Sequence, residues 1–407
     1  MRTEELLRFE KEHGARNYTP LDVVLTRGEG IWVYDVAGKR YLDGLSAYSA
    51  LNHGHCHPRL VHALTEQAQR LTLASRAFHT DQYALLLERL TRLTGYDAAL
   101  LMNTGVEAVE TAIKLARKWA YTVKGVTSNQ AEIIVAQDNF HGRTVTALSF
   151  SSERLYREYF GPYTPGFVIV PYGDSQALEA AITPRTAAVL VEPIQGEAGV
   201  VIPPQGYLQD VRRLCSQHNA LLLVDEIQTG LGRTGLLFAH QYEQITPDIT
   251  IIGKALGGGM YPVSAILANR ALMDVFQPGE HGSTFGGNPL GAAVAIEALD
   301  VLADEHLIER SAQLGQMILE KLQAQMHTLP LVKEVRGKGL LIGIELYPEA
   351  GGARRFCEQL KDQGLLCKET HENVIRFAPP LIIDPESAAW AVDIILSSVV
   401  SMDTMLL

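Results

Sequence analysis

The sequence predicts an α/β fold, with a large domain built on a mostly parallel sheet of the seven-stranded type and a smaller α+β domain. Three observations favour this fold. Short apolar runs of strand length lie between about residues 100 and 265, helical patterns alternate with them, and the pattern changes from about residue 290 onward. Alternation of strands and helices indicates a parallel sheet that is covered by helices on both faces.

The expected strands are continuous apolar segments, which is typical of strands that are buried on both faces. They are residues 98–103, 132–137, 167–171, 187–193, 220–226 and 248–253. In the segment 105–121, Val106, Val109 and Ile113 recur at three- and four-residue steps, which is the spacing of one helix face. A second helix is expected over residues 206–219.

The chain changes character towards its C-terminus. A long helical run over 292–307 precedes 332–347 and 374–383, which we interpret as two strands separated by a helical segment. Residues 30–45 are expected to form an early hairpin, which has no core of its own and should pack on the smaller domain. The expected division is an N-terminal segment over 1–49, a large ligand-binding domain over 50–289 and a small domain over 290–407.

The composition indicates a soluble protein. Of the 407 residues, 47% are hydrophobic and 20% are charged, which suits a large core and about two domains. A net charge of −11 disfavours nucleic acids and anionic membranes as partners. The four cysteines are scattered, as in a reducing compartment. The acidic N-terminus resembles no targeting signal, and no apolar run approaches the roughly 18 residues of a membrane helix. We therefore expect a cytoplasmic protein.

Polar residues follow two of the expected strands, at the edge where open α/β sheets bind ligands. Asp225, Glu226 and Gln228 end one apolar run, and Lys254 ends the next. One interpretation is a structural ion pair. The other is a reactive amine, because a lysine without hydration has a lowered pKa and attacks aldehydes.

Pyridoxal phosphate needs this combination of groups. It requires a lysine for a covalent link, a carboxylate to keep its ring nitrogen protonated, and backbone donors for its phosphate. A helix N-terminus supplies such donors. The turn Asn103-Thr104-Gly105 follows a strand and opens a helix, so the sequence offers all three parts.

Three other motifs suggest different chemistry. "GLGRTG", over 230–235, matches a dinucleotide-binding pattern, but no clean helical periodicity follows it. "GKALGGG" lacks the Ser or Thr that a P-loop needs after its lysine. "NHGHCHP", over 52–58, places His53, His55 and His57 close together, yet adjacent ligands rarely close a tetrahedral metal site. We expect a tight loop there and no metal.

Arg376 and Arg143 stand in apolar or small-residue surroundings. Each is either half of a buried ion pair or a clamp for a substrate carboxylate, which the guanidinium fork fits well. Carboxylate clamps beside a reactive lysine would indicate amino-acid and keto-acid substrates.

Long motifs in this order identify a family. "VEPIQGEAGV", "LLLVDEIQTGLGRTG", "PDITIIGKALGGGMYPVSA", "HGSTFGGNPL" and "VRGKGLLIGIEL" together resemble the class III, fold-type I aminotransferases that depend on pyridoxal phosphate. The resemblance extends from about residue 15 to about residue 400 without a large gap.

The resemblance implies roles for the residues around the cofactor. Lys254 would carry it covalently and later move a proton to and from the substrate carbon. Asp225 would pair with the ring nitrogen, Gln228 would bind the phenolic oxygen, and Phe140 would stack on the ring.

The cofactor's phosphate is implied to lie between two subunits. Gly105 and Val106 would donate backbone N–H groups to it. Thr284 would reach the phosphate of the neighbouring subunit, so the smallest active unit would be a homodimer.

Within the family, the chain is most similar to the branch that transfers the terminal amine of L-ornithine to 2-oxoglutarate. Its members imply that Tyr18 and Arg143 hold the α-carboxylate and α-amine, and that Tyr48 lines the same site. Glu197 would pair with Arg376 in the ornithine half-reaction. It would then move away so that Arg376 binds 2-oxoglutarate.

Several rivals share these residues. Acetylornithine and 4-aminobutyrate aminotransferases have the same lysine, aspartate and arginine, although acetylornithine enzymes usually have a small or aliphatic residue in place of Tyr48. An aminomutase needs no keto acid, and a binding protein could keep the fold without turnover. The expected product, glutamate 5-semialdehyde, would cyclise to pyrroline-5-carboxylate and link arginine breakdown to proline. His141 and Phe285 receive no role.

Overall fold

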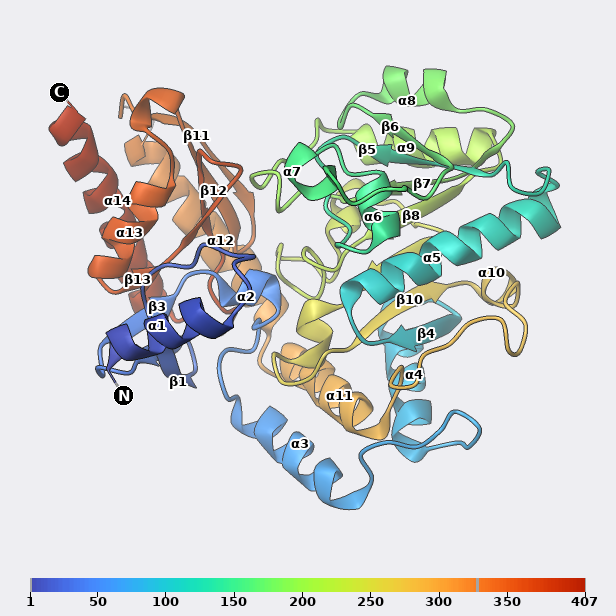
Figure 1. The fold of residues 1–407 in the computed structure, drawn as a ribbon, viewed down its shortest axis with the longest axis horizontal. Helices are drawn as coiled ribbons and strands as arrows, with labels where there is room; N and C mark the ends of the chain where they lie inside the picture. The colour runs from blue at the N-terminus through green and yellow to red at the C-terminus, as the bar shows by residue number, and fades with distance from the viewer. Residues whose placement is uncertain (1, 327–328, 407) are drawn as a thin grey trace.

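The computed structural model describes residues 2–326 and 329–406, whose strands form three sheets (Figure 1). The largest sheet has seven strands. In spatial order they are β4 (Ala98–Met102), β10 (Ser264–Ala268), β9 (Ile249–Ile252), β8 (Leu221–Asp225), β7 (Thr186–Val191), β5 (Glu132–Ala136) and β6 (Phe167–Val170). The predicted strands are confirmed to within a residue or two at their ends.

The strand β10 was not predicted. It lies between β4 and β9 and runs antiparallel to both, whereas β6, β5, β7, β8 and β9 are parallel. All of its residues, "SAILA", are buried. Alanine and serine have little intrinsic strand preference, so burial between two neighbours, rather than local sequence, places this segment in the sheet.

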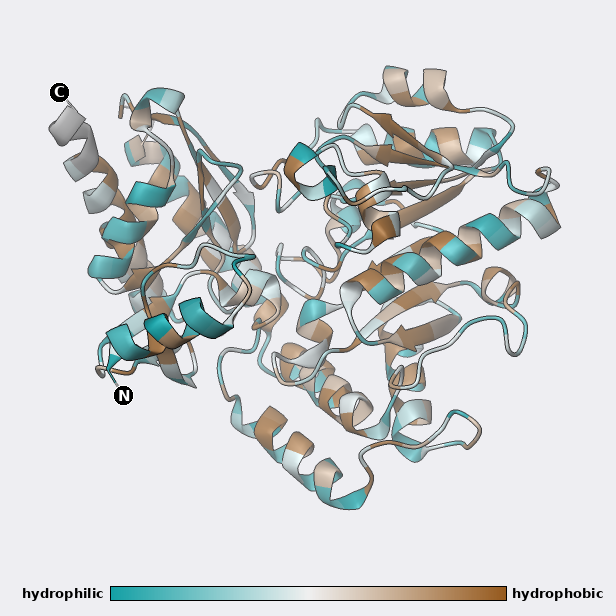
Figure 2. Cartoon of the chain, viewed as in Figure 1, coloured by the Kyte–Doolittle hydropathy of each residue, from teal (hydrophilic) through white to brown (hydrophobic). Residues whose placement is uncertain are grey.

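Helices cover both faces of the large sheet. Leu221 and Leu223 of β8 join the core formed with α5 (Gly105–Trp119), whereas Leu222 and Val224 join the core formed with α9 (Tyr207–Gln217). Successive strand residues point to opposite faces, so one continuous apolar run serves two cores. In Figure 2 the strands are brown along their length, while the helices outside them alternate teal and brown.

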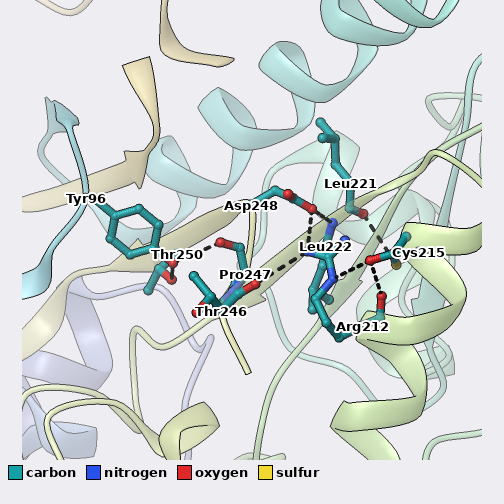
Figure 3. Close-up of polar contacts among 10 residues, drawn as sticks. Tyr96, Arg212, Cys215, Leu221, Leu222, Thr246, Pro247, Asp248 and Thr250 are labelled. Carbon is teal, nitrogen blue, oxygen red and sulfur yellow. Dashed lines mark hydrogen bonds and ion pairs between the residues drawn. The ribbon is translucent and has the colours of Figure 1, made fainter. Parts of the chain in front are cut away.

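Polar contacts at the amino ends of β8 and β9 fix how the two strands lie together (Figure 3). Asp248 Oδ2 accepts hydrogen bonds from the backbone N–H of Leu222 and from Arg212 Nη1, each at 2.7 Å. Tyr96 Oη donates to the carbonyl oxygen of Pro247 at 3.1 Å and contacts the hydroxyl of Thr250 at 2.7 Å. The opposite, carboxyl ends of the two strands carry Asp225 and Lys254.

A second sheet is antiparallel and has the order β11-β12-β15-β14. Its strands are β11 (Val332–Lys338), β12 (Leu341–Leu346), β15 (Val374–Phe377) and β14 (Lys368–Thr370). The segment 332–347 is thus a hairpin rather than the single strand predicted, because the chain turns at Gly339, whose φ is +52°. The helices of this part are α12 (Leu307–Met326), α13 (Arg354–Asp362) and α14 (Pro385–Leu406).

The predicted early hairpin is present as β2 (Trp32–Asp35) and β3 (Arg40–Asp43). It forms a third sheet with β1 (Leu25–Glu29) on one side and β13 (Leu365–Leu366) on the other. The pairing of β3 with β13 is parallel and joins residues more than 300 positions apart. The N-terminal part of the chain therefore lies against the C-terminal part, as Figure 1 shows in blue and red.

The structure also contains helices outside these groups. They are α1 (Thr3–His13), α2 (Ser46–Ser49), α3 (Pro58–Arg70), α4 (Asp81–Thr94), η1 (Ala120–Lys124), α6 (Val145–Ser149), α7 (Arg154–Arg157), α8 (Ser175–Ala181), η2 (Ala239–Glu243), η3 (Lys254–Gly257), α10 (Arg270–Met273), α11 (Pro289–Asp304) and η4 (Pro348–Ala350). Over the described residues, no helix is both long enough and apolar enough to cross a membrane.

Candidate active site

A cavity of about 190 Å³ lies at the carboxyl ends of the large sheet's parallel strands, where this architecture binds ligands. It brings together most of the residues predicted for the cofactor, which come from loops after four different strands. The lining includes Gly105, Val106, Phe140, Asp225, Gln228 and Lys254, together with His141, Glu192 and Glu197.

Lys254 follows β9 with a strained backbone, since its φ is +45°, a region that residues with a side chain rarely adopt. Burial lowers the pKa of its ammonium, although the carboxylate of Glu197 opposes this. Among the ion pairs of the described residues, none includes Lys254. The structural ion pair with Asp225 that the sequence left open is therefore absent there, and the amine is available for chemistry.

Asp225 is held instead by a histidine that sequence reasoning missed. His141 Nδ1 lies 2.7 Å from Asp225 Oδ2, and both side chains are buried. Burial alone would lower the pKa of His141, but the hydrogen bond and charge of Asp225 raise it. A proton on Nδ1 is donated to Asp225 and fixes the direction of its carboxylate. The sequence did contain one indication that His141 belongs to the site. It lies between Phe140 and Arg143, both of which were predicted to bind the cofactor or the substrate.

Glu192 adds a second buried carboxyl group beside this pair. Its Oε2 accepts a hydrogen bond from the backbone N–H of Phe140 at 3.1 Å. Burial raises the pKa of Glu192 to about 8, with the charge of His141 opposing this and that of Asp225 adding to it. Glu192 is thus the protonated carboxyl group near neutral pH.

The first turn of α5 provides backbone donors. The carboxylate of Glu107 accepts from the N–H groups of Thr104 and Asn103, at 2.6 and 3.1 Å, so this side chain caps the helix start. The N–H groups of Gly105 and Val106 have no partner inside the helix and border the cavity. A Cβ on Gly105 would lie only 3.0 Å from Ile227 Cδ1, which explains the glycine.

These groups fit pyridoxal phosphate. The amine of Lys254, the carboxylate of Asp225 and the N–H groups of α5 are the donor set that this cofactor needs. Gln228 Oε1 is buried beside them without a hydrogen-bond partner. A Cβ at Gly196 would lie 1.4 Å from that oxygen, so the glycine of "QGEAG" leaves the space that the amide occupies.

Glu197 and Arg376 form the predicted pair. Arg376 Nη1 lies 2.7 Å from Glu197 Oε1, and Gln228 Nε2 donates to the same oxygen at 2.9 Å. Burial opposes ionisation of Glu197, but the cations of Arg376 and Lys254 lower its pKa to about 2. Arg376 is almost fully buried and Glu197 is partly exposed, so the carboxylate is the member of the pair with room to move.

Tyr48 lies against Arg376, whose guanidinium carbon is 4.9 Å from the centre of the tyrosine ring. The backbone around Tyr48 is unusual. From Ser46 to Ser49 each residue has a positive φ, at 46°, 46°, 60° and 71°, which forms a left-handed turn. The hydroxyl of Ser46 donates to the carbonyl oxygen of Ala378 at 2.6 Å, and Asp43 Oδ1 accepts from the N–H of Ser46 at 2.8 Å.

The guanidinium of Arg233 holds this turn against neighbouring segments through four hydrogen bonds. Nη2 donates to Ser46 Oγ at 2.9 Å and to Asn52 Oδ1 at 2.6 Å, and Nη1 donates to the carbonyl oxygens of Leu340 and Pro379 at 2.8 and 2.6 Å. Burial lowers the pKa of Arg233 to about 9, which still leaves it charged near neutral pH. "GLGRTG" is therefore a structural turn that carries a buried arginine.

Tyr18 and Arg143 lie across a wider cavity of about 1340 Å³ that also reaches Tyr48. Tyr18 is 72% exposed. The guanidinium carbon of Arg143 lies 4.1 Å from the ring centre of Tyr156, a contact that the sequence did not predict. Tyrosine and arginine at the mouth of the site can bind a charged group far from Lys254.

Within one chain, Thr284 does not line the cavity that contains Lys254. It lies in a separate recess, which Lys114, Glu280, His281 and Ser283 also line. The role predicted for Thr284 involves a neighbouring subunit, and it stays a prediction.

The histidines of the loop 52–58 point to different partners. His53 Nε2 contacts the carbonyl oxygen of Ala298 at 2.9 Å, His55 contacts Asp43 at 2.8 Å, and His57 contacts Glu305 at 2.9 Å. Within the described residues, no group of three or more His, Cys, Asp or Glu side chains is arranged to hold a metal ion.

Comparison with known proteins agrees with this geometry. A family model described as aminotransferase class-III matches residues 13–399. The ornithine aminotransferase of Geobacillus sp. is 57% identical over 96% of this chain and 97% of its own length. That of Bordetella pertussis is 58% identical over 94% of this chain and 93% of its own.

Solved structures are similarly close. The ornithine aminotransferase of Toxoplasma gondii, in a structure with partial occupancy of pyridoxal phosphate at its active site, has a TM-score of 0.98 at 44% identity and covers 100% of this chain and 96% of its own. The acetylornithine aminotransferase of Elizabethkingia anophelis has a TM-score of 0.89 at 48% identity, over 98% of this chain and 100% of its own. The chain belongs to the class-III aminotransferase family.

Proposed function

We propose that this protein is a pyridoxal-phosphate-dependent aminotransferase that moves the δ-amine of L-ornithine to 2-oxoglutarate. The products are L-glutamate 5-semialdehyde, which cyclises to pyrroline-5-carboxylate, and L-glutamate. The main observation behind the proposal is the ion pair between Arg376 and Glu197, in which Nη1 lies 2.7 Å from Oε1. The same site also contains Tyr18, Tyr48 and Arg143. Relatives named ornithine aminotransferase, at 56–58% identity over nearly the whole chain, support it.

The cofactor supplies a positively charged ring that accepts the electrons left when a proton leaves the substrate carbon. Lys254 Nζ, whose pKa is lowered by burial, would move that proton between the substrate carbon and the cofactor. Asp225, held by His141, would place its carboxylate at the ring nitrogen. The N–H groups of Gly105 and Val106 would hold the phosphate, and Phe140 would cover the ring.

The pairing of Glu197 with Arg376 decides which amine of ornithine reacts. A free Arg376 would bind the α-carboxylate through two hydrogen bonds and bring the α-amine to Lys254. With Arg376 occupied, Tyr18 and Arg143 take the α-carboxylate and α-amine at the far side of the cavity, and the δ-amine reaches the lysine. When Glu197 moves away, Arg376 receives the α-carboxylate of 2-oxoglutarate.

We further propose a homodimer as the smallest active unit and the cytoplasm as its location. The separation of Thr284 from the Lys254 cavity supports a phosphate contact from a second subunit. Four free cysteines suit a reducing compartment. The proposed division at residues 1–49, 50–289 and 290–407 assigns the cofactor to the middle segment.

The test is an absorbance scan of the purified holoenzyme in single turnover, without keto acid. L-ornithine, N-acetyl-L-ornithine and 4-aminobutyrate are added separately. Rapid loss of the band of the lysine-bound cofactor with ornithine, followed by its return with 2-oxoglutarate, is the expected result. A reaction with N-acetylornithine alone would assign the protein to the other activity found among its neighbours, and a protein without any cofactor band would contradict the proposal.

A further inference from the structure

The segment that carries Tyr18 is held to the protein at one place. We call residues 15–22, between α1 and β1, the N-terminal strap. Its residues 15–20 are all exposed, so burial contributes little to its position. Six of its residues, from Arg16 to Leu21, line the wide cavity.

Arg354, the first residue of α13, holds the strap. Its Nη1 donates to the carbonyl oxygen of Thr19 at 2.8 Å, and its Nη2 donates to that of Pro20 at 2.7 Å. Over the described chain, these are the hydrogen bonds that join residues 15–22 to other segments. These hydrogen bonds hold Thr19 and Pro20, the two residues directly after Tyr18.

The same guanidinium is tied to the strand pair that carries Arg376. Arg354 Nη1 lies 3.3 Å from Glu369 Oε1, in β14. In the register of β14 with β15, Lys368 lies opposite Arg376. Thr370 Oγ1, also in β14, donates to the carbonyl oxygen of Glu197 at 2.5 Å. One arginine therefore connects Tyr18 to the element that positions both members of the Glu197–Arg376 pair.

We propose that Arg354 is a positioning residue for substrate selection, which fixes the distance between Tyr18 and the Glu197–Arg376 pair. This rests on the proposed ornithine activity. Ornithine would place its δ-amine at Lys254 and its α-carboxylate and α-amine at the strap. The distance between Lys254 and Tyr18 must therefore match the length of the substrate. A released strap would leave Tyr18 mobile and would weaken binding of that far end, because ordering the strap would then oppose binding.

The variant Arg354→Met keeps the aliphatic stem and removes the hydrogen bonds to the strap. Arg354→Lys keeps the charge but cannot contact both carbonyl oxygens with a planar fork, so it should rescue in part. The matched control is Glu358→Gln, because Glu358 accepts from Arg354 Nε at 3.0 Å, while over the described residues no hydrogen bond or ion pair joins Glu358 to the strap. The side chain of Arg354 is 31% exposed, so the fold should tolerate these changes.

For Arg354→Met we expect the KM for ornithine to rise about tenfold, the size of one lost hydrogen bond to a charged group, with kcat within about twofold. The half-reaction with 1-aminopentane, which has no far carboxylate, should be unchanged relative to wild type. Limited trypsin cleavage after Arg16, which lies in the exposed strap, should become faster, and Glu358→Gln should behave as wild type in all three measurements.

An unchanged KM for ornithine with unchanged trypsin cleavage after Arg16 would overturn the inference. So would an equal loss for ornithine and 1-aminopentane, which would indicate a general structural defect. If wild-type holoenzyme did not react with ornithine, the proposed function would fail, whereas the cleavage measurement would still decide whether Arg354 anchors the strap.

Discussion

The two halves of the active site are built in different ways. The cofactor half takes its central groups, Asp225 and Lys254, from the ends of β8 and β9, which are hydrogen-bonded neighbours in one sheet. The substrate half takes Tyr18, Arg143 and Arg376 from three distant parts of the chain that loops and one strand bring together. A sheet fixes the first set through its own backbone. The second set depends on individual side chains that join separate segments.

The difference predicts where function is robust. In the cofactor half, the contacts of Asp248 at the amino ends of β8 and β9 and the cores on both sheet faces hold the geometry collectively. In the substrate half, the side chains of Arg233 and Arg354 each connect segments that are far apart in the sequence. Changes to the substrate half should therefore alter selectivity while the cofactor stays bound.

The largest effect should come from Lys254→Ala, which tests the cofactor half directly. Removal of Lys254, the one lysine among the described residues that line the cavity, should reduce turnover by at least about a thousandfold, as expected when a catalytic base and nucleophile is lost. The absorbance of the purified variant should lack the band of a lysine-linked cofactor. Turnover near that of wild type would refute the assignment of Lys254.

The next largest effect concerns stability. Arg233→Met should leave four buried oxygen atoms without their donor, and the free energy of unfolding should fall by about 3–5 kcal/mol. Thermal melting followed by fluorescence measures this. Arg213→Met is the matched control, since Arg213 is about half exposed and pairs with Asp210 within one helix, and its loss should cost less than about 1 kcal/mol. If both variants lost the same free energy of unfolding, the buried hydrogen bonds of Arg233 would contribute no more to stability than an exposed ion pair.

Glu197→Ala tests the separation of the two substrates. Arg376 would then be free in both half-reactions, so the rate with L-glutamate relative to the δ-reaction of ornithine should rise by about tenfold or more, the value of a charge-assisted contact. Single-turnover rates with each amino acid give the ratio. If the ratio stays as in wild type, Glu197 does not control access to Arg376.

Tyr48→Ile should have a smaller effect of the same kind. The substitution removes the ring that lies 4.9 Å from the Arg376 guanidinium, a contact that contributes roughly a two- to fivefold factor in binding. Preference should move from ornithine towards 4-aminobutyrate, as judged by kcat/KM for both. Identical preference in variant and wild type would remove Tyr48 from the choice of substrate.

The last prediction is a pH dependence of stability that belongs to the cofactor half. The pKa of Glu192 is raised by burial to about 8, so between its ordinary value near 4.5 and pH 8 the folded protein holds a proton that the unfolded chain has lost. Stability is therefore greatest below this interval and falls as pH rises through it, by at most about tenfold per pH unit in the unfolding equilibrium.

Glu192→Gln stays neutral, keeps an acceptor for the Phe140 N–H, and faces the same His141, Asp225 and Glu197 charges. Its melting temperature should fall less than that of wild type between pH 5 and pH 8, measured in the same buffers. Parallel curves for the two proteins would show that Glu192 is ionised throughout.

The sequence predicted the cofactor half better than the substrate half, for a physical reason. Lys254, Asp225 and the start of α5 are each next to a strand whose apolar run is visible locally, and parallel strands end at the same edge. His141 was missed because a histidine gives no local sign of its partner, Asp225, 84 positions away. The strand β10 was missed because its residues have weak strand preference.

In the substrate half, the pairing of Glu197 with Arg376 came from family resemblance rather than from any local pattern. Arg233 was considered only as part of a nucleotide-binding motif, and the turn at Ser46–Ser49 was not expected at all. These features depend on contacts between residues more than 100 positions apart, such as Arg233 with Ser46 and Pro379, and spacing along the chain does not reveal them.

The left-handed turn at Ser46–Ser49 has an evolutionary consequence. Left-handed backbone costs about 1–2 kcal/mol per residue with a side chain, and glycine would avoid most of that cost at the exposed Ala47, whose φ is +46°. Selection for stability alone would favour glycine there, yet glycine would also let the turn adopt many other shapes. Alanine at position 47 is thus a compromise. It lowers the stability of the fold, but it restricts the backbone of the turn and thereby fixes the direction of the Tyr48 side chain.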